Sequence, residues 1–154
     1  MPESLTPLRA FNFEVEIQAN GQSALCEASF AECDGMEMTM DVKTIRQGGD
    51  TGRQIRLTGP MGFGTLTLKR GMTRNFDLWR WVGGYSRTAD QKKRAEVRVV
   101  VKSADGQRAE ATFRLSRCVP LKLKAPALNA KDGLVAIEEL QLAYESIELQ
   151  EASS

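Results

Sequence analysis

The stretch GPMGFGTLTLKRGMTRNFDLWRWVGG, Gly59 to Gly84, contains a turn pattern, a strand pattern and both tryptophans of the chain. Its first six residues hold three glycines and a proline, which interrupt regular secondary structure. The run that follows, Thr65 to Gly71, alternates leucine with threonine or lysine, and this period of two predicts a strand with one buried face. The middle of the chain is therefore expected to be a strand that leads directly into a helix.

Residues 74–83 have the spacing of an amphipathic helix. Phe76, Trp79 and Val82 recur three residues apart, an aspartate lies near the start, and two glycines end the pattern. Because Trp79 and Trp81 both fall here, this helix offers the largest apolar side chains for packing on a sheet.

Length and composition predict a single domain, residues 1–154. The chain is 42% hydrophobic and has a net charge of +1, so it can bury a core and has no global field that would select nucleic acid or an anionic membrane. No apolar run is long enough to span a bilayer. The first ten residues include two prolines and lack the apolar core of a signal peptide, which predicts an extended arm at 1–10, assembly in the cytoplasm and no membrane insertion by this subunit.

Residue types that usually carry catalysis or hold metals are scarce. The sequence has no histidine, and its three cysteines form no CxxC pair, so they are expected to be reduced and buried. The glycine-rich segment GGDTGRQ, residues 48–54, lacks the Lys-Ser/Thr pair of a phosphate-binding loop. We therefore predict no enzyme, no catalytic residue, no metal site and no cofactor.

Strict alternation from Phe11 to Ile17 predicts a first strand, with apolar residues on one face and Asn, Glu and Gln on the other. Asn20-Gly21 favours a two-residue hairpin turn, because a type I′ turn needs positive φ at both central residues. With that turn, Phe13 is expected opposite Ala28, and the apolar faces of the two strands coincide.

The same pairing places Glu14 opposite Glu27, with Glu16 nearby. Like charges opposite one another are mildly destabilising in a sheet. The polar face of this hairpin is therefore either merely solvated, or it lines a wet channel or meets a basic partner.

A third strand is expected from Met36 to Ile45, where methionines recur at every second position. The residues that follow, 46–64, are dense in glycine and have no sustained apolar period, which predicts a long loop. Such loops are uncommon in compact domains and are usually functional or flexible, and we expect this one to order against a neighbouring subunit. Its candidate contact residues are Arg46, Gly48, Gly49, Arg53 and Arg56.

Alternation in the C-terminal half predicts a hairpin that pairs Val97 with Phe113 through a three-residue loop, 104–106, with Gly106 in the left-handed region. An extended connector is expected at 120–126, between two prolines. The final stretch, residues 134–150, fits a helical stripe and, piecewise, a strand, so periodicity leaves helix and strand equally open.

Several of these segments together resemble the tail tube proteins of contractile phages and of phage-tail-like injection systems. The resemblance runs from about Leu8 to Leu149. Its most specific parts are LTLKRG at 66–71 followed by the tryptophan-bearing helix, and AIEELQLAYE at 136–145. It favours a strand for the final stretch, because the closing segment of that family is a strand.

The resemblance implies a mainly β fold, a sandwich or barrel-like tail tube fold with one packed α-helix, whose subunits form hexameric rings. The rings stack into a tube inside a sheath, in a virion or a phage-tail-like particle. The implied partners are other copies of the chain, sheath, baseplate and spike proteins, and DNA or protein cargo in the lumen.

Residue by residue, the family's strand-to-helix junction and helix packing fall on Lys69, Arg70, Gly71, Phe76, Trp79 and Trp81. Residues 46–64 match the loop that reaches a neighbouring ring. A conduit favours a polar inner face, and two sets of residues are candidates for its lining. The first set is Glu14, Glu16 and Glu27, and the second is Arg98, Thr112 and Arg114.

Two alternative functions remain open from the sequence. A tube-initiator or baseplate adaptor of the same fold would join the spike to the first ring. A monomeric β-barrel would instead use the Gly/Arg segment to hold an anionic ligand.

Overall fold

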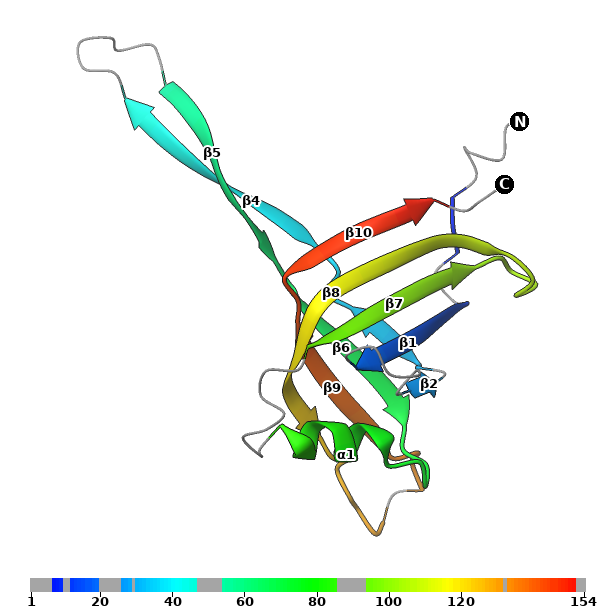
Figure 1. The fold of residues 1–154 in the computed structure, drawn as a ribbon. Helices are drawn as coiled ribbons and strands as arrows, with labels where there is room; N and C mark the ends of the chain where they lie inside the picture. The colour runs from blue at the N-terminus through cyan, green and yellow to red at the C-terminus, as the bar shows by residue number, and fades with distance from the viewer. Residues whose placement is uncertain are drawn as a thin grey trace.

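The computed structural model describes residues 7–9, 12–19, 26–28, 30–46, 54–85, 94–131 and 133–151. Within those ranges the strands are β1 (Phe13–Ala19), β2 (Cys26–Ala28), β3 (Glu32–Asp34), β4 (Met38–Arg46), β5 (Gln54–Phe63), β6 (Thr65–Gly71), β7 (Ala95–Lys102), β8 (Ala109–Lys124), β9 (Ile137–Ala143) and β10 (Ser146–Glu151). One helix, α1 (Asp77–Gly84), lies between β6 and β7 (Figure 1). The predicted mainly β class with a single helix is confirmed for this part of the chain.

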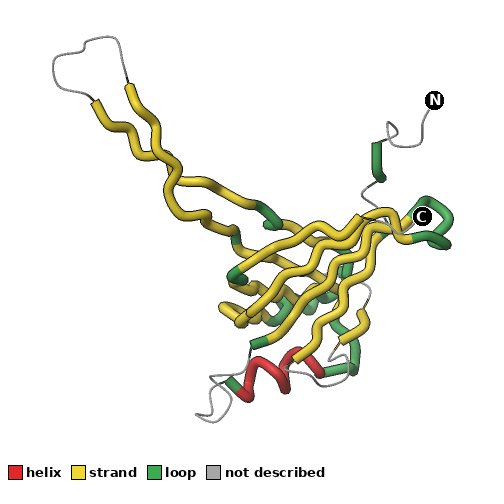
Figure 2. The backbone as a smooth tube through the Cα atoms, turned by 45° about the horizontal axis from the view of Figure 1, so that its top comes forward, coloured by secondary structure: helices red, strands yellow, loops and turns green. Residues whose placement is uncertain are grey.

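Eight of the described strands form one sheet that folds over on itself. Its order is β2-β1-β7-β8-β9-β6-β3, with β10 added beside β8. Strand β8 belongs to both halves, because its first part pairs with β7 and β10 and its last part pairs with β9. Arg117, which has a positive φ of 54°, lies where β8 passes from one half to the other. We call this folded sheet together with α1 the body (Figure 2).

Buried side chains of the body come from every second position of its strands, as a sheet with one covered face requires. Val15, Val97, Leu66 and Leu140 are each no more than 1% exposed and belong to one apolar cluster. The alternation predicted for β1, β6 and β7 is confirmed. The core therefore fills the space between the two halves of the folded sheet.

Pairing of the first hairpin differs from the prediction by two residues. Val15, rather than Phe13, lies opposite Ala28, and Glu16, rather than Glu14, lies opposite Glu27. A shift of two leaves every side chain on its predicted face, because the side-chain period of a strand is two. Asn20-Gly21 lies outside the described residues.

The β7–β8 hairpin is also shifted by two residues. Val97 lies opposite Leu115, and Val99 lies opposite Phe113. The backbone N–H of Ser103 donates to the carbonyl of Arg108, so the loop is longer than the three residues predicted. Gly106 has a φ of +75°, as predicted.

Two further predictions about the C-terminal half are resolved. The prediction of a connector at 120–126 was wrong, because β8 continues to Lys124 with a register shift between Pro120 and Lys122. The final stretch is strand rather than helix, and it consists of β9 and β10. The apolar residues move from even positions in β9 to odd positions in β10, and the change falls between these two strands, which pair with different parts of β8.

The predicted long loop at 46–64 is largely wrong as a description of structure. Residues 54–63 are strand β5, which pairs with β4 in a two-stranded ribbon that projects from the body (Figures 1 and 2). Pro60 is compatible with this strand because the pairing is irregular there, and a proline is tolerated at a bulge in an edge strand. We call β4 and β5 together the projecting hairpin.

Candidate assembly surfaces

The projecting hairpin exposes apolar side chains on a strand pair that has no third strand among the described residues. Near its base, Met38 lies opposite Phe63 and Met40 opposite Met61. The exposed large hydrophobic residues of the hairpin are Met38, Met40, Val42, Ile45, Ile55, Leu57 and Met61, each between 39% and 61% exposed. An isolated two-stranded hairpin is marginally stable in water. This surface therefore has the character of a contact surface that its own body does not cover.

Toward the end of the described hairpin the two faces differ. Ile45 lies opposite Ile55, and Leu57 shares their face. Arg46 and Arg56 lie on the other face, opposite Gln54 and Thr44. Of the residues predicted for this segment, Arg46 and Arg56 are exposed on the hairpin. The remaining three, Gly48, Gly49 and Arg53, lie outside the described residues.

A buried ion pair joins β6 to β9 beneath the helix. Arg70 and Glu138 lie opposite one another in the ladder and are 5% and 1% exposed. The Arg70 Nε donates to Glu138 Oε1 at 2.5 Å, and its Nη2 donates to Asp77 Oδ1 at 2.8 Å. The guanidinium also lies 5.5 Å from the centre of the Phe30 ring. Arg70 therefore connects Asp77, the first residue of α1, to β6 and β9.

Glu138 is a site residue that the sequence patterns did not predict. Its second oxygen, Oε2, accepts a 2.8 Å hydrogen bond from the Trp79 indole Nε1, so both carboxylate oxygens have a protein donor. A signal was available: Glu138 has the same parity as Leu140 and Leu142, and Arg70 has the same parity as Leu66 and Leu68. A charged residue in phase with buried leucines on each of two paired strands indicates a buried pair.

The packing face of α1 is rotated from the predicted one. The helix begins at Asp77 rather than at residue 74, and Phe76 is its N-cap with no side-chain capping bond. Leu78 is fully buried, whereas Phe76 is 42% exposed, so the predicted packing role of Phe76 was wrong. Trp81 packs against the core and makes an edge contact with the Tyr85 ring at 5.6 Å. The helix thus closes the end of the body away from the projecting hairpin (Figure 1).

The other two junction residues are placed at the surface of the same strand. Lys69 lies 3.4 Å from Glu32 of β3 in a partly exposed ion pair. Gly71 ends β6, and a side chain there would only touch Val135. Of the three junction residues, Arg70 alone is buried.

The candidate lumen residues whose side chains are described, from both sets, belong to one face of the sheet. Glu16 lies opposite Arg98, and Arg98 lies opposite Arg114, so these three form a row across β1, β7 and β8. Thr112 and Glu14 lie in the adjacent row. Residues of both sets can therefore line the same surface, and they are not alternatives. We call this outer surface of β1, β7, β8 and β10 the polar face.

The basic side chains of the polar face each lie beside an acidic one. Glu14 pairs with Lys102 at 2.6 Å, and Glu16 lies 3.8 Å from Arg98. Arg114 pairs with Glu96 at 3.0 Å. The side chain of Glu27 lies outside the described residues. Partly exposed pairs of this kind contribute little to stability, and they give a hydrophilic surface without a strong field.

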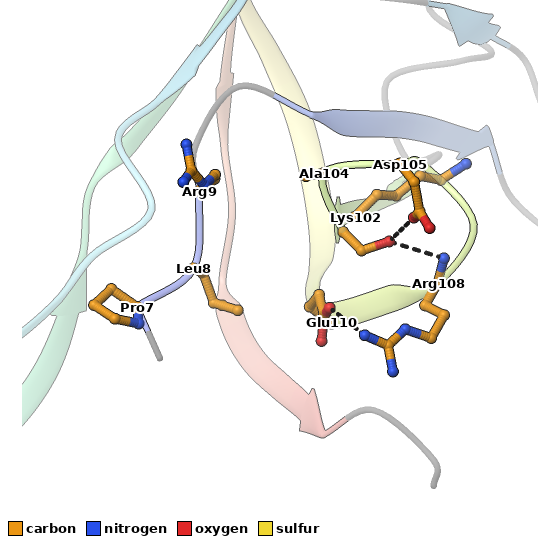
Figure 3. Close-up of a pocket in the computed structure, with 9 residues that line it drawn as sticks. Pro7, Leu8, Arg9, Lys102, Ala104, Asp105, Arg108 and Glu110 are labelled. Carbon is orange, nitrogen blue, oxygen red and sulfur yellow. Dashed lines mark hydrogen bonds and ion pairs between the residues drawn. The ribbon is translucent and has the colours of Figure 1, made fainter. Parts of the chain in front are cut away.

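A shallow cavity of about 490 Å³ lies between residues 7–9 and the turn after β7 (Figure 3). Its basic side chains on the turn side already have acidic neighbours: Lys102 pairs with Glu14, and Arg108 lies 3.6 Å from Glu110. Asp105 accepts hydrogen bonds from Ser103 and Gln107, and these bonds lower the pKa of its carboxyl group. The two basic side chains on the turn side are therefore already neutralised by acidic neighbours.

The side chains of two of the three cysteines, Cys33 and Cys118, are described, and both are free thiols. Burial raises the pKa of Cys33 to about 11 and that of Cys118 to about 12. Both thiols stay protonated and unreactive at neutral pH, as expected for cysteines that fill space. The described helix is too short and too polar to cross a membrane.

Comparison with known proteins gives a family match over most of the chain. Residues 9–148 match the model of the family described as T4-like virus tail tube protein gp19. No curated protein sequence matches significantly.

Solved structures share the fold at low sequence identity. A chain of the anti-feeding prophage (AFP) baseplate has a TM-score of 0.84 and 23% identity, with 95% of this chain and 97% of that chain covered. A chain of the sheath–tube complex of PVC, an extracellular contractile injection system, has a TM-score of 0.81 and 19% identity, with 99% of each chain covered. Hcp1 from Flavobacterium johnsoniae has a TM-score of 0.53 and 11% identity, with 90% and 96% covered.

Proposed function

The chain belongs to the T4-like virus tail tube protein family, and from this premise we propose that it is the repeating wall subunit of the inner tube of a contractile injection particle. Six copies form a ring, and rings stack into a tube around a lumen. The single observation that carries the proposal is the projecting hairpin, which exposes apolar side chains that the rest of the subunit does not cover.

Ring closure is supported by the strand edges of the body. The half of the sheet that carries the polar face has the order β2-β1-β7-β8-β10, and among the described strands β2 and β10 are its two edges. Open edges are templates for pairing with another chain. When the β10 edge of one copy meets the β2 edge of the next, a head-to-tail contact forms, and such contacts generate closed rings when the rotation closes.

Stacking is assigned to the projecting hairpin. Nine residues of extended strand reach about 30 Å, which is far enough to leave one ring and touch the next. Burying Ile45, Ile55 and Leu57 against another copy removes apolar area from water, which is the main driving force of association. In this arrangement Arg46 and Arg56 lie on the opposite face of the hairpin, away from this apolar contact.

The polar face is proposed to line the lumen. It carries paired charges such as Glu14–Lys102 and Glu16–Arg98 and no apolar patch, so a passing macromolecule meets no adhesive surface. The outer partners proposed for the assembled tube are a sheath and a baseplate with its spike. The cargo is DNA or protein, and the finished tube is part of a virion or a phage-tail-like particle that assembles in the cytoplasm.

Electron microscopy of the purified chain tests the proposal. The expected objects are rings with six times the mass of one 17.0 kDa chain, and tubes built from those rings. A chain that stays monomeric at all concentrations, and that phosphate stabilises, would instead support the anion-binding module.

A tube initiator is the second candidate, because a chain from an AFP baseplate structure shares the fold as closely as a chain from the PVC sheath–tube structure does. The same micrographs separate the two candidates. A wall subunit gives long tubes, whereas an initiator gives isolated rings that stack on one face only.

A further inference from the structure

One side chain of the body contacts both ends of the projecting hairpin where they join the sheet. Tyr144 directly follows β9 and is 5% exposed. Its hydroxyl oxygen lies 2.7 Å from the carbonyl oxygen of Gly35, 3.0 Å from the amide nitrogen of Glu37 and 3.2 Å from the amide nitrogen of Gly64. Residues 35–37 precede β4, and Gly64 follows β5.

These contacts use the full hydrogen-bonding capacity of a phenol. A tyrosine hydroxyl has one donor and two acceptor positions. It donates to the carbonyl of Gly35, with the carbonyl of Glu37 a second acceptor at 3.1 Å, and it accepts from the amides of Glu37 and Gly64. The two amides lie between strands, so the hydroxyl gives them partners at the place where the ladder is interrupted.

Close packing around the hydroxyl leaves the backbone little room to move. Gly35 has a φ of +97°, and a Cβ there would lie 1.8 Å from the carbonyl oxygen of Thr65. A Cβ on Gly64 would lie 2.6 Å from the side chain of Glu37. The ring of Phe63, the last residue of β5, has its centre 5.7 Å from that of the Tyr144 ring. The backbone at residues 35–37 and 64, the joint between the hairpin and the body, is therefore confined to one geometry.

We propose that Tyr144 is the positioning residue of the projecting hairpin: its hydroxyl fixes the direction in which β4 and β5 leave the body. A two-stranded ribbon held at only one strand could swing about that strand. Because one oxygen atom binds the backbone on both sides, the hairpin moves with β9 as a rigid part. The consequence for stacking rests on the proposed function, since a fixed direction presents Ile45, Ile55 and Leu57 to a neighbouring copy in a single orientation.

The decisive variant is Tyr144→Phe, which keeps the ring in the core and removes only the oxygen. Tyr85→Phe is the matched control, because it removes the only other tyrosine hydroxyl of the chain, on the far side of the body beside α1. Hydrogen exchange is measured by mass spectrometry on the full chain, with each variant and the wild type in the same oligomeric state.

In Tyr144→Phe the amides of Glu37 and Gly64 lose their acceptor, and peptides covering the hairpin are expected to exchange about ten-fold faster. Peptides from β7 are expected to keep their wild-type rate in both variants. Unchanged exchange at the hairpin base would overturn the proposal. Equal acceleration across the whole chain would also overturn it, because it would mean that the hydroxyl supports general stability rather than the joint.

The wild-type protein gives a test that needs no substitution. The amides of Glu37 and Gly64 are expected to be protected to within about ten-fold of the amides of β9, although they lie outside the strand ladders. Exchange as fast as that of an exposed loop would overturn the proposal.

Tube formation supplies a separate readout. In electron micrographs, Tyr144→Phe is expected to give rings with few or short tubes, whereas Tyr85→Phe gives tubes of wild-type length. If the wild type forms no tubes, the proposed function fails, but the exchange data still decide whether Tyr144 positions the hairpin.

Discussion

The body and the projecting hairpin use the same kind of strand pairing but place their apolar residues in opposite environments. In the body, Leu66 and Leu140 are buried between two halves of a sheet, and the charged pair Arg70–Glu138 is enclosed with its hydrogen bonds satisfied. In the hairpin, Ile55 and Leu57 are exposed on a ribbon two strands wide. The body covers its apolar residues with its own contacts, whereas under the proposed function the apolar residues of the hairpin are covered by another copy of the chain.

The largest loss of stability is expected for a substitution in the buried Arg70–Glu138 network of the body. Glu138→Ala removes both acceptors of the buried network and leaves the Arg70 guanidinium with less compensation, so the free energy of unfolding should fall by about 3–5 kcal/mol. Glu139→Ala, one position along β9 and on its outer face, should change it by about 0.5 kcal/mol or less. Urea denaturation measures both. A loss below about 1 kcal/mol for Glu138→Ala would show that the network does not hold the helix to the sheet.

Two substitutions in and beside α1 are expected to give the next largest difference in stability. Leu78→Ala empties a fully buried position and should cost about 2–5 kcal/mol. Phe76→Ala removes a larger side chain that is 42% exposed, and it should cost about 1 kcal/mol or less. Thermal unfolding of the two variants ranks these costs. The reverse order would restore the packing face that the sequence predicted for this helix.

Sequence patterns predicted which face each body strand buries but not the pairing register. Both hairpins of the body are shifted by two residues, since alternation fixes parity and only the loop length fixes the partner. Arg70 and Glu138 were not singled out as a buried pair, because charged residues are expected outside unless their partner is known. A single strand carries no information about what lies opposite it.

The projecting hairpin shows a different limit of sequence reasoning. Gly59, Pro60 and Gly62 indicate a loop by their local preferences, yet they lie in β5. These residues are tolerated because the ribbon is exposed and irregular at that point, so no neighbouring strand needs the missing proline N–H. The hydroxyl of Tyr144 could not be placed either, since its partners lie 80 to 109 residues away in the chain.

A smaller effect is expected on the polar face, whose charged pairs are partly exposed. Glu16→Gln should change the free energy of unfolding by about 1 kcal/mol or less, because it removes the pair with Arg98 and also a charge that lies opposite Glu27 in the ladder, and 1 M salt should reduce that change further. The loss caused by Glu138→Ala should depend much less on salt, because its partners are buried. Denaturation at low and high salt makes the comparison. A large, salt-independent loss for Glu16→Gln would mean that this face is enclosed by the subunit itself and is not available to a lumen.

The smallest effect on stability is expected at the hairpin, where assembly should respond instead. Leu57→Asp places a charge on the face shared with Ile45 and Ile55, and a side chain that is already 48% exposed contributes little to the fold of the subunit. The free energy of unfolding should change by about 0.5 kcal/mol or less. Stacking should be lost, because the aspartate and Lys43, which lies opposite it, would both have to leave water at an apolar contact, and that desolvation opposes association. Sedimentation and electron microscopy count the rings and tubes.

Thr58→Asp is the matched control for Leu57→Asp, since it adds the same charge one residue along on the opposite face of β5. If only Leu57→Asp prevents stacking, the apolar face of the hairpin is the part that another copy covers. If both variants stack normally, the hairpin is not the contact between rings. If Leu57→Asp instead unfolds the subunit, the hairpin contributes to the stability of its own subunit. That result would contradict the contrast between a self-contained body and an exposed hairpin.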